Sequence, residues 1–273
     1  MSAETRHPST RVAERASTPF AAHLVVALLA VLLAVLLPSA GAAQAPTAQA
    51  LTAQAIVARH DSLVGGRAAL EGHRSVRMVG TFAIPALGID APLEILKVRP
   101  NKYLFRTTFG PLGESLSGFD GTTAWGVHPG QGAILLEKEM ARQVADQADF
   151  FGDFHDLSRF DAVERATDAE FQGRRVQRVY MIRAGGDTIT EFFDAASGLS
   201  AGTLTSVGGA MGRSQTTTLV GAYKSFGRLM VATRMEQRTP QFTLLIAILS
   251  VEFDTIDEAE VALPESVRAL IKP

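Results

Sequence analysis

Apolar and polar residues alternate with a period of two from Val76 to Phe253, in short runs that end at turn residues. Such alternation is typical of half-buried strands, and turns such as Pro100-Asn101 and Asp120-Gly121 are typical of hairpins. The pattern therefore predicts a long antiparallel meander. Its strands are expected at residues 76–84, 91–98, 103–109, 114–119, 122–127, 132–136, 160–167, 175–183, 188–194, 199–206, 214–222, 229–237 and 241–253.

Helical periodicity occurs in two places. Residues 53–64 are rich in alanine, have apolar residues at helical spacing and end at Gly65-Gly66, with a short second turn at 68–70. A longer helix is predicted from about Glu137 to Phe154, because helical spacing places an apolar stripe on one side and charged residues on the opposite side. That stripe consists of Leu136, Met140, Val144 and Ala148 or Phe151.

About a dozen strands with two substantial helices favour one large antiparallel sheet. A sheet of this width bends or closes toward a barrel, and its concave face must be filled by side chains, a helix or a ligand. The last strand sharpens this expectation, because both of its faces are apolar. Phe242, Leu244, Ile246 and Ile248 point one way, and Leu245, Ala247, Leu249 and Val251 point the other. Two interpretations stay open: a strand packed on both faces, or a strand with one face on an apolar cavity.

The N-terminus has the layout of a secretory signal peptide. Arg6, Arg11 and Arg15 precede an unbroken apolar stretch, 24–37, and small residues follow at 38–43. We expect cleavage near residue 43 and a linker at 44–49, which leaves one domain at 50–273. The alternative is an inner-membrane anchor formed by residues 20–37, which is just long enough to span a bilayer.

Composition excludes several classes of protein. The chain has 273 residues, 47% hydrophobic, a formal net charge of −2 and no cysteine. A disordered chain would have fewer apolar residues, and a nucleic-acid-binding domain would carry a basic excess. Without cysteine, the chain can be neither a disulfide scaffold nor a lipoprotein itself.

Four segments together resemble the LolA/LolB-like superfamily of outer-membrane lipoprotein-sorting proteins, over about residues 50 to 264. The strongest pair is Val98-Arg99-Pro100-Asn101-Lys102-Tyr103, similar to an Arg-Pro strand end, and 119–125 (Phe-Asp-Gly-Thr-Thr-Ala-Trp), similar to a "DG-K-T-x-W" hairpin. Residues 65–70 resemble the Gly-Gly turn after the first helix, and 193–199 resemble a "D-x-x-TGL" turn. Asp120-Gly121-Thr122 lacks the usual lysine, and the sequence after Trp125 is less polar than in the family.

The resemblance implies a mainly β fold with some helix: a curved, incompletely closed antiparallel β-barrel with helices covering its mouth and a cavity for acyl chains. It also implies that Arg99 matches the arginine that contacts the lid, where the guanidinium would donate to helix carbonyls and hold the lid closed. A solvated rim arginine is the alternative. Trp125 has two interpretations as well, namely structural core or cavity wall, and the phenylalanines near 150–154 are either core or part of a lid. The candidate cavity and lid residues are Arg99, Trp125, Phe119, Met140, Val144, Phe151, Phe154, Leu244, Ile246 and Ile248.

Enzymatic chemistry has little support in the sequence. Residues 198–202 read G-x-S-x-G, but a turn precedes Ser200 and a strand is predicted after it, whereas a nucleophile elbow needs a strand and then a helix. Residues 153–156 (Asp-Phe-His-Asp) do not have the spacing of a metal site. We therefore expect no cofactor, no metal and no catalytic residue, although paired carboxylates that meet only in space stay open.

The sequence thus favours an exported, monomeric, non-enzymatic carrier in the bacterial periplasm that shields the acyl chains of a lipid or lipoprotein. A donor or acceptor protein of the inner or outer membrane is a possible partner, and nucleic acid is not expected. Two alternatives are a regulatory or scaffold domain that binds a protein partner and a cryptic hydrolase.

Overall fold

A single antiparallel sheet dominates the computed structural model, which describes residues 50–152, 154–209 and 212–271. The predicted leader 1–43 and linker 44–49 lie outside the described residues. Each predicted strand is present, and the bounds shift by a few residues. The strands are β1 Ser75–Ile84, β2 Ile89–Val98, β3 Lys102–Thr108, β4 Glu114–Phe119, β5 Ala124–His128, β6 Gly132–Leu135, β7 Ala162–Phe171, β8 Arg174–Ile182, β9 Thr188–Asp194, β10 Ser200–Gly209, β11 Gly212–Phe226, β12 Leu229–Arg238 and β13 Thr243–Phe253.

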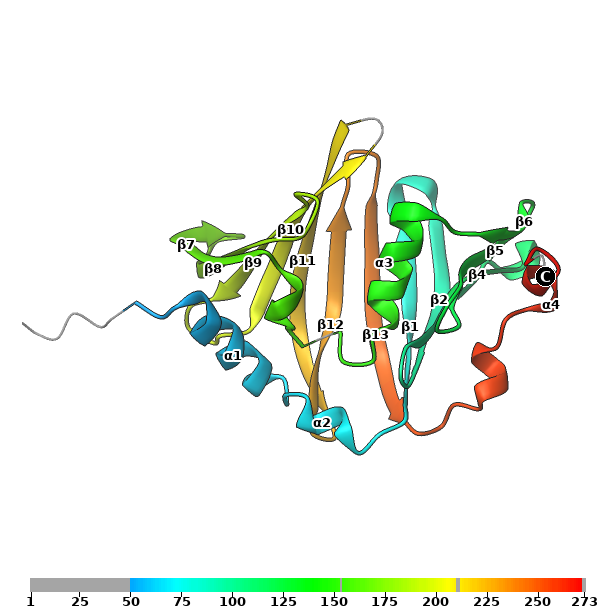
Figure 1. Cartoon of the computed structure of the whole chain (residues 1–273), viewed down its shortest axis with the longest axis horizontal. Helices are drawn as coiled ribbons and strands as arrows, with labels where there is room; N and C mark the ends of the chain where they lie inside the picture. The colour runs from blue at the N-terminus through cyan, green and yellow to red at the C-terminus, as the bar shows by residue number, and fades with distance from the viewer. Residues whose placement is uncertain (1–49, 153, 210–211, 272–273) are drawn as a thin grey trace, which may run out of the picture. The chain divides into compact units, whose positions relative to one another are not determined.

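The order of the strands is simple. Among the described residues the sheet has 13 strands, in the order β6-β5-β4-β3-β2-β1-β13-β12-β11-β10-β9-β8-β7. Strands that pair in the sheet are consecutive in the chain, except for β1 and β13. Between β6 and β7 the chain crosses from one edge of the sheet to the other (Figure 1). Because the two edge strands do not pair, the sheet is open, as expected for an incompletely closed barrel.

Short helices accompany the sheet. They are α1 Ala53–Leu63, α2 Ala68–Glu71, α3 Lys138–Ala148 and α4 Glu265–Arg268, with 3-10 turns at Pro85–Leu87, Gly110–Leu112, Leu157–Arg159 and Glu258–Val261. The hydroxyl of Thr52 accepts a hydrogen bond from the amide of Ala55 and caps α1. Gly65 and Gly66 follow α1 with φ of 112° and 63°, which suit glycine and turn the chain toward α2.

The two faces of the sheet are covered by different parts of the chain. On one face, here called the inner face, α1 packs against β7 and β8, and α3 packs against β3, β4 and β5 (Figure 1). On the opposite, outer face, the C-terminal segment that contains α4 covers β2 to β6. Strand pairing fixes the register, because Ile246 lies opposite both Phe82 and Met235. Ile246 and Ile248 therefore lie on the inner face, and Leu245 and Leu249 lie on the outer face.

The middle helix is shorter than predicted. It ends at Ala148, because Asp149 leaves the helical conformation with ψ of 118° and its carboxylate accepts a hydrogen bond from the amide of Phe151. The prediction of a helix to residue 154 was therefore wrong. The apolar stripe continues past the helix because the phenylalanines that follow pack onto the sheet in an irregular segment.

Candidate functional site: the aromatic strap and the inner face

An irregular segment crosses the inner face between α3 and β7. We call residues 149–152 and 154–160 the aromatic strap. Phe150 and Phe154 are almost fully buried, and Phe151 is partly buried. They pack with residues of the central strands and of the turn after α1, including Val64, Met78, Leu93, Leu229 and Ile248. The strap thus covers the inner face where a concave sheet would otherwise hold a cavity.

Around this buried cluster the inner face is less tightly packed. Half-buried apolar side chains border it on β1, β2, β3, β12 and β13; among them are Phe82, Ile95, Phe105, Met235 and Ile246. The side chains beneath the three phenylalanines are therefore continuous with a wider apolar surface that the strap covers only in part.

Two arginines lie over the strap. The guanidinium carbon of Arg67 is 4.2 Å from the ring centre of Phe151, and that of Arg99 is 4.8 Å from the same ring and 5.2 Å from the ring of Phe150. Nη2 of Arg99 also donates to the carbonyl of Leu70 in α2, at 3.3 Å. Arg99 thus contacts a helix carbonyl, although in α2 and not in the predicted lid helix, and it makes two cation–π contacts with the strap.

The middle of the strap is held by a partly buried ionic cluster, which we call the latch. Nδ1 of His155 is 2.7 Å from Oδ1 of Asp61 in α1, and Nε2 is 2.7 Å from Oε2 of Glu191 in β9. The amide of His155 also donates to Asp61, at 3.1 Å. Glu191 is 7% exposed, so this carboxylate relies on its protein partners. One histidine therefore fastens the strap to a helix and to a strand.

The latch carries a positive charge on its histidine. Burial alone would lower the pKa of His155, but the carboxylates of Glu191 and Asp61 outweigh it and raise the pKa to about 10. Burial alone would raise the pKa of Glu191, but the charge of His155 outweighs it and lowers that pKa. Neighbouring His60 is different, because burial lowers its pKa. At neutral pH a cation is therefore held between two carboxylates, with a neutral imidazole beside it.

The predicted site residues fall into several groups. Arg99, Phe151, Phe154, Ile246 and Ile248 meet at the strap cluster. Phe119 and Val144 lie in the adjoining cluster beneath α3, which shares Ile95 and Phe105 with the strap cluster. Leu244 is half-buried on the inner face. Met140 is 59% exposed on α3 and does not contribute to the clusters.

Trp125 belongs to the other face. It is 1% exposed and packs with Leu96, Leu104, Val261 and Val267 between the sheet and the C-terminal segment. Gly118 lies directly across from it, where any Cβ would stand 2.4 Å from the indole ring. The interpretation of Trp125 as a cavity wall on the concave face is therefore wrong, and the core interpretation is correct.

Neither the latch nor the role of Arg67 was predicted from the sequence. The three latch residues are far apart in the chain, and an isolated histidine between acidic residues has no recognisable spacing. The G-x-S-x-G segment behaves as its context predicted: Ser200 is buried at the start of β10, and no helix follows it. Within the described residues, no group of three or more His, Cys, Asp or Glu side chains is placed to bind a metal ion.

Comparison with known proteins identifies the fold. No family model matches the chain, and no curated protein matches it by sequence. A LolA superfamily protein from Nitrosomonas europaea superposes with a TM-score of 0.53 at 12% identity, covering 78% of this chain and 99% of that one. A putative outer membrane lipoprotein-sorting protein domain from Vibrio parahaemolyticus gives 0.51 at 14% identity, covering 77% and 97%.

A DUF1329 family protein from Desulfovibrio piger gives a TM-score of 0.53 at 8% identity, with 77% of this chain and 95% of that chain covered. The chain therefore has a LolA-like fold. At these identities the likeness concerns the fold alone. For the part of the chain that is described, no helix is both long enough and apolar enough to span a membrane.

Proposed function

We propose that this protein is a non-enzymatic carrier that shields the acyl chains of a lipid or lipoprotein against the inner face of its sheet. The observation that supports this most directly is the strap. Three phenylalanines of an irregular segment cover an apolar surface that extends beyond them on several strands. In this proposal acyl chains take the place of the rings when the strap lifts, and the strap returns on release.

The energetics favour such an exchange. Each methylene group withdrawn from water contributes about 0.8 kcal/mol, so two or three acyl chains provide more than enough affinity for binding. Release is then the harder step. Phenylalanine rings that return to the same surface bury part of the apolar area that the acyl chains leave, about 150–250 Å² for each ring. They therefore offset part of the affinity for the cargo and make release less costly.

Arg99 and Arg67 hold the closed state in this proposal. Their guanidinium groups lie over the rings of Phe150 and Phe151, and Arg99 also binds the carbonyl of Leu70. A cation–π contact of this kind contributes roughly 0.5–1 kcal/mol at an exposed site. Contacts of this size bias the strap toward closure and still allow it to open.

The proposed setting is the periplasm. We propose that residues 1–43 export the chain as a cleaved signal peptide, with an inner-membrane anchor at 20–37 as the alternative, and that 50–273 is the carrier domain. A donor or acceptor protein of the inner or outer membrane would pass the cargo on. The fold likeness to a putative outer membrane lipoprotein-sorting protein domain is consistent with this setting.

The decisive experiment is lipid mass spectrometry on the protein purified from its native envelope, combined with displacement of a fluorescent fatty acid. We expect co-purified lipid at a reproducible molar ratio and saturable displacement. Ile246→Asp is a poor probe, because core and cavity would fail together. Phe151→Ala removes a ring that is only partly buried, and we expect it to raise the affinity for the fatty acid. Phe171→Ala, which removes a ring stacked on Phe192 of β9, away from the strap, is a matched control.

A protein-binding function is the second candidate. Phe150 and Phe154 already occupy the centre of the inner face with the protein's own side chains, which is what a regulatory or scaffold domain would show. If purified protein contains no lipid, does not bind the fatty acid and instead retains a stoichiometric protein partner, the carrier proposal fails and the second candidate is supported.

A further inference from the structure

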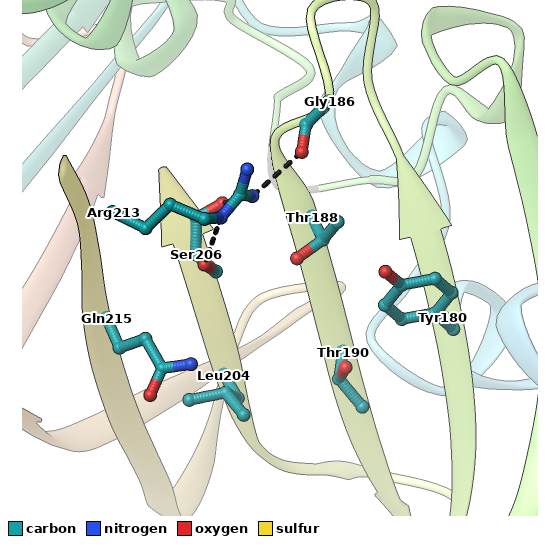
Figure 2. A pocket seen from close by; sticks show the side chains of 8 residues that line it. All are labelled: Tyr180, Gly186, Thr188, Thr190, Leu204, Ser206, Arg213 and Gln215. Carbon is teal, nitrogen blue, oxygen red and sulfur yellow. Dashed lines mark hydrogen bonds between the residues drawn. The ribbon is translucent and has the colours of Figure 1, made fainter. Parts of the chain in front are cut away.

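A polar hollow of about 400 Å³ is lined by residues of strands β8 to β11 (Figure 2). It lies on the outer face, because its residues Tyr180 and Thr190 alternate with Val179 and Ile189, which pack on the side of α1. Its side chains rise from four consecutive strands and form rungs across them. Tyr180 lies across from Thr190, which lies across from Leu204, while Thr188 and Gln215 both lie across from Ser206. Arg213 completes the rim.

The hollow presents many hydrogen-bonding groups that the protein does not use. Among the described residues, the side chains of Tyr180, Thr188, Thr190 and Gln215 have no hydrogen-bond partner. Hydroxyl and amide groups can both donate and accept. Neighbouring strands lie about 4.8 Å apart, a spacing close to the width of a pyranose ring. The ring of Tyr180 adds an apolar surface with a polar tip at one end.

Arg213 is fixed in a way that disfavours an anion. Its Nε donates to Oγ of Ser206 at 3.1 Å, and its Nη2 donates to the carbonyls of Gly186 at 2.8 Å and Ser206 at 3.2 Å (Figure 2). These three contacts use both N–H groups of Nη2 and that of Nε, so the free donors are those of Nη1. The fork that binds phosphate or carboxylate with two nitrogens is therefore occupied.

The charge around the rim agrees with this. Asp187, adjacent to Thr188, accepts from the amide of Gly208 at 2.9 Å and pairs with Arg142 at 2.8 Å. Arg142 compensates the charge of Asp187, and Arg213, the one arginine of the lining, already uses Nε and Nη2 on protein acceptors. Hydroxyl groups, an amide and an aromatic ring remain, and they are suited to a neutral ligand with many hydroxyls.

We infer that this hollow is a binding site for a carbohydrate, either a short free glycan or the sugar headgroup of a glycolipid. It lies on the opposite face from the strap and does not depend on the carrier proposal. Ring faces would stack on Tyr180, and sugar hydroxyls would exchange hydrogen bonds with Thr188, Thr190 and Gln215.

The test uses maltotriose, cellotriose and chitotriose as probes in saturation-transfer NMR and calorimetry on the purified protein. Vesicles of phosphatidylcholine with and without monogalactosyl diacylglycerol form a second arm. We expect saturable binding of at least one trisaccharide, or of the galactolipid vesicles only, which would identify a headgroup as the source. Thr190→Val and Tyr180→Ala should each weaken binding by about 3- to 10-fold.

Thr216→Val, on the same strand as Gln215 but on the inner face, is the matched control and should bind as the parent does. Absence of binding in both arms overturns the inference. So does unchanged affinity in Thr190→Val and Tyr180→Ala when their melting temperatures match that of the control, or competition by inorganic phosphate, which would indicate an anion site. None of these outcomes bears on lipid binding at the inner face.

Discussion

The sheet is covered on both faces, and the two covers are built differently. On the outer face the C-terminal segment packs Val261 and Val267 against Trp125 with almost no exposed surface. An ion-pair network adds to it, since Arg77 bonds Glu260 at 2.8 Å and also contacts Glu94. On the inner face the strap leaves Phe151 partly exposed and is fastened by polar contacts at the latch. Phe150 and Phe154 are buried about as fully as Val261 and Val267, so we expect the strap to open first at the partly exposed ring of Phe151 and at the polar latch.

The largest expected effect tests the cover of the outer face. Trp125→Ala should lower the free energy of unfolding by about 4 kcal/mol, because it removes a fully buried ring from a core that Gly118 shapes around it. Urea denaturation measures this. Fatty-acid affinity per folded molecule should be unchanged, and a parallel loss of affinity would show that the two covers are coupled.

The second-largest effect is expected from a substitution in the latch. His155→Gln should cost about 2–3 kcal/mol, because it leaves Asp61 and the buried Glu191 without their cation. It should also increase the rate at which a fluorescent fatty acid enters. Asp161→Asn, at an exposed position just after the strap, is the control, and we expect its unfolding curve to match that of the parent. A stable His155→Gln variant with unchanged uptake would mean that the strap is held elsewhere.

The latch also predicts how stability depends on pH. The pKa of His155 is raised to about 10 in the folded protein from an ordinary 6.5, so its contribution is complete below pH 6.5 and is lost as pH rises toward 10. The pKa of Glu191 is lowered from 4.5, so its contribution is complete above pH 4.5 and is lost in acid. We therefore expect the latch to stabilise the fold most between pH 4.5 and pH 6.5. Urea midpoints from pH 4 to 10 measure this, and His155→Gln should reduce the loss of stability as the pH rises above 6.5.

A smaller effect is expected at the N-terminal end of the strap. Arg99→Leu removes one hydrogen bond and two cation–π contacts, so the free energy of unfolding should fall by about 1–2 kcal/mol. Fatty-acid retention should increase, because the closed state loses more than the open one. Stopped-flow release measures this. Release at the parent's rate would show that Arg99 is only a surface residue.

The smallest effect concerns Met140. It is 59% exposed on α3, so Met140→Gln should change the free energy of unfolding by less than about 0.5 kcal/mol. Fatty-acid affinity should stay the same if α3 acts through its buried side alone. A clear loss of affinity would identify Met140 as a contact for the cargo.

Period-two alternation made the strands predictable, because successive side chains of a strand point to opposite faces of the sheet. The apolar stripe alone did not reveal where α3 ends. Phe150, Phe151 and Phe154 would be buried both in a longer helix and in an irregular segment that packs on the sheet, so their pattern does not distinguish the two. Trp125 could not be assigned to a face, because both faces of its strand are buried. Only the fold determines which cover it meets.

Part of the C-terminal segment carries a recognisable sequence signal, although no element was predicted there. Asp257 and Glu260 form a capping box around the turn Glu258–Val261, and the pattern Asp-x-x-Glu is visible in the sequence. The latch had no such signal. Asp61, His155 and Glu191 come from α1, the strap and β9, and only the crossing from one sheet edge to the other brings them together.

That crossing has a consequence for any cargo. The strap is joined covalently to β7 at one end and, through α3, to β6 at the other, so it can lift from the sheet but never diffuse away. If the carrier proposal holds, the strap acts as a competitor at a fixed effective concentration, on the order of millimolar for short connections, however dilute the protein. In that proposal the cargo must outcompete a ligand that dilution cannot remove. Purification alone would then not keep the inner face open once the cargo has left.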